Sequence, residues 1–123
     1  MEEIKIVRAD SRTVRIKLSE EGVVHYLGQE DFALFAVYEP SGKVLIQKKL
    51  TAEHQNAQGV LEIELLPQDT RNIGVGQKLC PGDIVPLKWE LEVHIGSSVF
   101  SPAVAQNFTV VIDGIMNTED TDA

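Results

Sequence analysis

The strongest constraint on the fold is a nine-residue stretch, residues 87–95, in which apolar and polar side chains alternate without a break. Leu87, Trp89, Leu91, Val93 and Ile95 alternate with Lys88, Glu90, Glu92 and His94. Successive side chains of a β-strand point to opposite faces, so this pattern predicts a strand with one buried and one solvated face. Sheets with one solvated face are typically antiparallel, and the stretch therefore indicates a half-buried antiparallel sheet.

Further strand-like stretches recur along the chain at roughly regular spacing. They are residues 4–8, 14–18, 32–38, 43–50, 60–66, 99–101 and 105–113, with residues 23–28 ambiguous. Residues 32–38 are apolar on both faces, as expected of a central strand, and Pro67 begins a short helical turn over residues 68–72. Residues 51–59 and 74–83 are expected to be loops. Together they predict an all-β protein, a single immunoglobulin-like antiparallel β-sandwich of about seven to eight strands.

The length of 123 residues predicts one domain. We assign residues 1–116 to the β-sandwich domain. Residues 117–123 are acidic and lack large apolar side chains, so they are expected to form a disordered tail.

The overall charge argues against several classes of partner. The formal net charge is -8, whereas proteins that bind nucleic acids or anionic membranes need basic surfaces. No stretch approaches the roughly 20 apolar residues of a membrane span. The N-terminus has no apolar signal-peptide core, which predicts synthesis in the cytoplasm. We therefore expect neither nucleic acid nor membrane as a partner.

The residues that could carry chemistry form no recognised set. The lone Cys80 cannot form a disulfide within the chain and is expected to be an inert loop or semi-buried thiol. His25, His54 and His94 lack the close spacing of metal ligands. The carboxylates of the turns lack calcium-loop spacing and are expected to be solvated: Glu20, Glu21, Glu30, Asp31, Asp69, Asp83 and Asp113. We therefore predict no catalytic, cofactor-binding or metal-binding residues, no cofactor and no enzymatic activity.

Three other features of the sequence could mark ligand sites. Residues 74–79 read Gly-Val-Gly-Gln-Lys-Leu but lack a third glycine and a following helix, so a flexible connection is favoured over a phosphate loop. Residues 107–109 fit a glycosylation acceptor but lie inside a predicted strand. Tyr26 and Tyr38 could stack on sugars if exposed, whereas Trp89 is expected in the core.

Five segments taken in order resemble a known family. They read GKVLIQKK (42–49), LEIELLPQDT (61–70), PGD (81–83), KWELEV (88–93) and NFTV (107–110). This order resembles the small β-sandwich domain at the N-terminus of phage upper-baseplate and tail-fibre-associated proteins. The chain departs from that pattern in having Trp89 in place of tyrosine, a longer loop over residues 72–82, and Gln106-Asn107 in place of the glycine before the last strand.

The resemblance implies a non-enzymatic structural component of a phage or prophage tail. It would be a baseplate or tail-fibre-associated adaptor or attachment domain, bound to other tail or baseplate proteins in a virion or phage-like particle, with homo-oligomers among the expected assemblies. Asp69 and Thr70 are then expected to be structural, capping the turn after a strand. The alternative interpretation is a carbohydrate- or ligand-binding β-sandwich module, with the loop over residues 72–82 forming the site.

Overall fold

The computed structural model describes residues 3–114 of the chain. The acidic segment expected to be disordered, residues 117–123, lies outside these residues. The strands are β1 (Ile4–Val7), β2 (Arg12–Lys17), β3 (Ser19–Glu20), β4 (Val23–Val24), β5 (Phe32–Tyr38), β6 (Val44–Leu50), β7 (Val60–Leu65), β8 (Ile84–Ile95) and β9 (Ser98–Val111). A 3-10 turn, η1 (Ala52–His54), and one helical turn, α1 (Pro67–Thr70), interrupt them.

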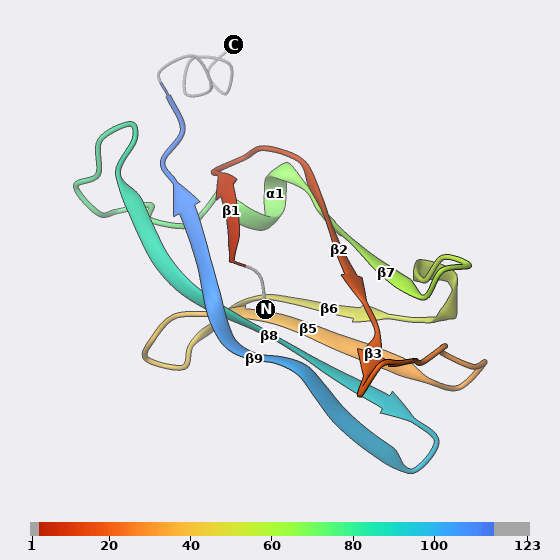
Figure 1. Cartoon of the computed structure of the whole chain (residues 1–123). Helices are drawn as coiled ribbons and strands as arrows, with labels where there is room; N and C mark the ends of the chain where they lie inside the picture. The colour runs from red at the N-terminus through yellow and green to blue at the C-terminus, as the bar shows by residue number, and fades with distance from the viewer. Residues whose placement is uncertain (1–2, 115–123) are drawn as a thin grey trace.

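The strands form one large sheet and a smaller layer that covers one of its faces (Figure 1). The large sheet has five strands in the order β1-β9-β8-β5-β6, and β2 pairs with β7 to form the smaller layer. The two-residue strands β3 and β4 make a separate ladder. The prediction of an all-β fold is therefore confirmed.

Two details of the architecture differ from the expected form. The large sheet is mixed, because β1 runs parallel to β9 while its other pairs are antiparallel. The covering layer in the described residues has two strands, so the strict immunoglobulin sandwich is not established.

The core lies between the large sheet and the β2–β7 layer. The alternation in β8 works as predicted, since Leu87, Trp89, Leu91 and Val93 are all buried. Trp89 is only 1% exposed, and its ring centroid lies 5.7 Å from that of Phe35 on the neighbouring strand. The same face of β5 and the inward faces of β2 and β7 complete one apolar cluster.

Strand β9 joins two stretches that the sequence separated, residues 99–101 and 105–113. The register with β8 shifts twice along it, from Trp89 opposite Gln106 to Val93 opposite Phe100, so β9 contains two extra residues. Such bulges allow one strand to continue through Pro102 and through Ala105, whose φ is +50°. The breaks expected from the sequence are therefore bulges within a single strand.

Candidate functional site

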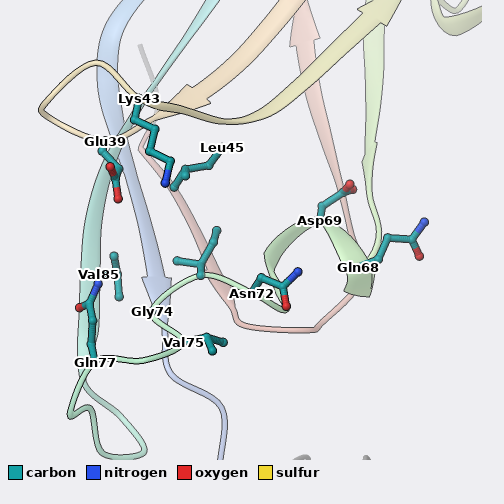
Figure 2. Close-up of a pocket in the computed structure, with 11 residues that line it drawn as sticks. Glu39, Lys43, Leu45, Gln68, Asp69, Asn72, Gly74, Val75, Gln77 and Val85 are labelled. Carbon is teal, nitrogen blue, oxygen red and sulfur yellow. The ribbon is translucent and has the colours of Figure 1, made fainter.

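A cleft of about 340 Å³ opens between the turn that joins β5 to β6 and the loop that follows α1 (Figure 2). The turn and the start of β6 contribute Glu39, Lys43 and Leu45. The other side is formed by α1, by the loop and by the start of β8. Its lining residues are Gln68, Asp69, Asn72, Ile73, Gly74, Val75, Gln77 and Val85.

The loop side of the cleft is fixed from below. Ile73 is buried, its N–H donates to the carbonyl of Thr70 over 2.9 Å, and its own carbonyl accepts a hydrogen bond from Arg8 over 3.0 Å. The guanidinium of Arg8 also donates through Nε to Oδ1 of Asp113, just past the end of β9. The base of the cleft is thereby tied to residues near both ends of the described chain.

Gly74 is needed where the loop turns back. Its φ is +80°, and a Cβ atom there would lie 2.8 Å from Cδ1 of Leu79. Both the backbone conformation and the close approach favour glycine. This glycine begins the stretch that resembles a phosphate loop, and the element that follows it is the strand β8 rather than a helix.

The short helix α1 forms where the sequence predicts a turn, with Pro67 at its first position. Oδ2 of Asp69 accepts hydrogen bonds from the backbone N–H of Leu66 and from Nζ of Lys48, each over 2.7 Å. Thr70 is fully buried, and its hydroxyl accepts a hydrogen bond from the N–H of Ala9 over 2.7 Å. Both residues are structural, as predicted, although Thr70 holds the chain after β1 rather than capping the turn.

The charged and polar groups around the cleft give it a mixed character without a dominant sign. Asp69 is paired with Lys48, and the turn brings one cation, Lys43, beside one anion, Glu39. Figure 2 shows the side chains of Glu39 and Lys43 extending from the turn toward the loop. Two amide residues, Asn72 and Gln77, lie on the opposite side. Within residues 3–114 their side-chain amides form no hydrogen bond, which leaves both donors and acceptors open to a ligand.

A second, more open groove of about 310 Å³ lies beside the outer face of the β2–β7 layer. Thr13, Arg15, Glu62 and Glu64 line it together with residues of η1. Arg15 donates through Nε to Glu62 over 3.1 Å, which is a solvent-exposed cross-strand pair.

The three histidines lie in three separate parts of the fold: His25 follows β4, His54 ends η1 and His94 lies in β8. The ring of His25 lies 5.0 Å from that of Phe100, and Nδ1 of His54 accepts the N–H of Thr51. His94 stacks on Phe32 at 4.5 Å. In the part of the chain that the structure describes, no group of three or more histidine, cysteine, aspartate or glutamate side chains could hold a metal ion.

The expectation that the turn carboxylates are solvated is wrong for Asp113, which is buried against Arg8. Asp69 is half-buried, whereas Glu20, Glu21, Glu30 and Asp83 are exposed. Asp83 still has a local role, accepting the N–H of Cys80 over 2.8 Å.

Asp31 joins two turns. It accepts hydrogen bonds from the N–H groups of Gly96 over 3.0 Å and Gly28 over 2.7 Å. These bonds, the one from Gly96 foremost, lower the pKa of Asp31 below its usual value of 3.8. The carboxylate therefore supports the turns as a hydrogen-bond acceptor.

The other candidate side chains are mostly accounted for by local contacts. Cys80 is exposed in its loop. Tyr26 is exposed and donates to the carbonyl of Ala57 over 3.2 Å, far from the cleft in sequence. Burial and a hydrogen bond to Glu90 raise the pKa of Tyr38 above 10.0. Asn107 lies within β9, as expected, where it accepts a hydrogen bond from Lys88 over 2.8 Å.

The alternative interpretation of the sequence assigns a ligand site to the loop over residues 72–82, and Asn72 and Gln77 of this loop line the cleft. Nothing local in the sequence indicates that Glu39 and Lys43 face a loop some 30 residues later.

The outer face of the large sheet is a second candidate surface, for a protein rather than for a small ligand. Phe32, Leu34, Ala36 and Tyr38 alternate with the core residues of β5 and are half-buried on this face. At one end of the sheet, Val7, Val111 and Ile84 are aligned across β1, β9 and β8. Within residues 3–114, the strands of the second layer cover the opposite face only (Figure 1).

No protein-family model and no curated protein matches the chain. In residues 3–114, no helix is long and apolar enough to span a membrane.

Proposed function

We propose that this protein is a non-enzymatic structural component of a phage or prophage tail that acts through contacts with other proteins. The observation that carries the proposal is the row of apolar side chains that β5 places on the outer face of the five-stranded sheet. Strand β5 is apolar on both faces, a pattern typical of strands covered on both sides. Its outward residues therefore suit a surface that a partner protein covers.

A second group of apolar residues lies at one end of the sheet. Ile84 is 57% exposed and Val7 is 36% exposed, and both flank Val111 in register. Apolar residues bordered by charged ones are typical of protein–protein interfaces. Lys88, Glu90 and Glu92 of β8 lie opposite Tyr38, Ala36 and Leu34, so charged residues border the apolar row of β5.

The residues behind the family resemblance support the sandwich itself. Gly42 closes the β5–β6 turn with a φ of +99°, and its N–H donates to the carbonyl of Glu39 over 2.7 Å. Trp89 and Phe108 are core residues. The resemblance therefore concerns a scaffold, which fits an adaptor or attachment role.

The experiment begins with the genes that flank this one. If they encode baseplate, tail-tube or tape-measure proteins, those products are tested for binding to the purified chain by calorimetry. Leu34→Glu and Ile84→Glu should each weaken binding at least tenfold, because each places a charge in the apolar face. Val23→Glu is the matched control, since Val23 is 60% exposed on β4, away from this face.

The result can contradict the proposal in two ways. Flanking genes for sugar-processing or cell-surface proteins, combined with no binding to tail proteins, would exclude the tail assignment. Equal binding by wild type, Leu34→Glu and Ile84→Glu would remove the outer face as the interface. Light scattering of the same samples reports whether the chain itself forms oligomers.

A further inference from the structure

We propose that the cleft between the β5–β6 turn and the loop after α1 binds a neutral carbohydrate. This site is separate from the outer face of the sheet, because its lining comes from the turn, α1, the following loop and the inward-facing Val85. It therefore goes beyond the structural role proposed above and does not depend on it.

The charges that line the cleft favour a ligand without net charge. The positive and negative groups of the cleft balance, since Asp69 is already bound to Lys48 and the turn contributes one lysine and one glutamate. A phosphate or nucleotide site would need an excess of cations or a set of convergent backbone N–H groups. The rest of the chain, with its net charge of -8, would also repel an anion. A ligand without net charge fits this cleft best.

The hydrogen-bonding groups of the cleft match those of a sugar. A sugar hydroxyl both donates and accepts, and an amide side chain offers two donors and an acceptor. Asn72 and Gln77 supply such groups from the loop, and in residues 3–114 neither side chain is engaged. Glu39 adds acceptors and Lys43 adds donors from the facing turn (Figure 2). Both walls of the cleft therefore offer hydrogen-bonding groups to sugar hydroxyls.

The apolar lining and the volume of the cleft also suit a sugar. Leu45, Val75 and Val85 give the cleft apolar surface against which the C–H face of a sugar ring can pack. The volume of about 340 Å³ falls at the lower end of the range for small-ligand sites. One or two sugar rings are therefore the expected size of the ligand.

Contacts within the protein hold the loop side of the cleft in place. The contacts of Ile73 with Arg8 and Thr70, and the close packing of Gly74 against Leu79, fix the loop before any ligand binds. A preformed site loses less conformational entropy on binding, which is important for a weak ligand.

The test is an NMR titration of the whole ¹⁵N-labelled chain with glucose, galactose and N-acetylglucosamine, taken separately into the high-millimolar range. At least one sugar should give saturable shifts at Asn72, Gly74, Val75 and Gln77. The chemical shifts of Thr13, Arg15 and Glu62, which line the other groove, should not change. The double variant Asn72→Ala, Gln77→Ala should weaken binding at least tenfold, whereas Gln29→Ala, in an exposed loop elsewhere, should bind like wild type.

Three results would overturn the proposal. They are no saturable shift with any of the three sugars, equal binding by the double variant, or tighter binding of inorganic phosphate than of every sugar. The spectrum of the double variant shows directly whether it is folded. The sugar titration and the binding of tail proteins to the outer-face variants are separate measurements. Failure of one proposal therefore leaves the other untouched.

Discussion

Lys48 and Asp69 connect the two layers of the fold: Nζ of Lys48 on β6 lies 2.7 Å from Oδ2 of Asp69 in α1. The same oxygen accepts the N–H of Leu66 over 2.7 Å, so one carboxylate both caps the helical turn and binds the lysine. The side chains are 22% and 17% exposed, which limits screening by water without removing it.

Asp69→Ala is expected to destabilise the protein by about 1–3 kcal/mol, because it removes the cap and leaves the Lys48 charge partly buried. Lys48→Met should have a smaller effect, since the bond from Leu66 remains. Urea denaturation measures both, with Gln68→Ala as an exposed neighbouring control. If Lys48→Met destabilised as much as Asp69→Ala, the cap would contribute nothing.

Arg8→Met, at the base of the cleft, should reduce the free energy of unfolding more than Lys48→Met does. It removes the bond to the carbonyl of Ile73 and leaves Asp113, whose side chain is 7% exposed, without its cation. Loss of one partner of a largely buried pair is expected to reduce the free energy of unfolding by about 3 kcal/mol.

Hydrogen exchange provides a second measurement for Arg8→Met. Faster exchange is expected at Ile73 and Val75, because the loop is no longer held from below. Arg15→Met, which breaks an exposed pair, is the control and should change stability by less than about 1 kcal/mol. Equal effects of the two variants would contradict the role assigned to Arg8.

The lowered pKa of Asp31 predicts a contribution to stability that is lost only in acid. Its folded-state pKa is lowered by the N–H groups of Gly96 and Gly28, so the ionised carboxylate stabilises the fold at any pH well above 3.8. This contribution is lost as the pH falls from the usual value of 3.8 through the lower folded-state pKa.

Thermal denaturation of wild type and Asp31→Asn over a range of pH tests this directly. Wild type should be the more stable protein at neutral pH, and the difference should shrink once the pH falls below 3.8. A difference that stayed constant into strong acid would mean that the charge of Asp31 is not what supports the two turns.

Ala105→Gly is predicted to be neutral or to stabilise the protein by up to about 1 kcal/mol. The residue sits at a β9 bulge with a φ of +50°, where a Cβ atom is strained and glycine is not. Ala103→Gly, two residues earlier and buried at 2% exposure, should instead destabilise by roughly 0.5–1 kcal/mol or more. Opposite signs in the two denaturation curves would confirm the bulge.

Local sequence patterns predicted the strands well. The alternation of residues 87–95 specifies a half-buried strand at any place in a fold, and residues 32–38 gave β5 with the observed bounds. Pro67 likewise determines where α1 begins, because proline suits the first position of a helix. These features depend on neighbours in sequence.

The pairing of β1 with β9 and the composition of the cleft depend on residues far apart in the chain. Ile4 lies opposite Phe108, and no local pattern in either strand specifies a parallel partner at that distance. β1 pairs with β9 only from Phe108 onward, so the missing N–H of Pro102 disrupts no pairing with β1. Glu39 and Gln77 line one cleft although they lie far apart in the sequence.

The parallel arrangement of β1 and β9 has a mechanical consequence. The two strands run in the same direction, with the chain entering β1 at Ile4 and leaving β9 at Val111 (Figure 1). A pull between residues before Ile4 and after Val111 would slide one strand along the other and strain their backbone bonds simultaneously, with Arg8 and Asp113 adding a further link. Under tension the domain would thus resist in shear rather than open one bond at a time.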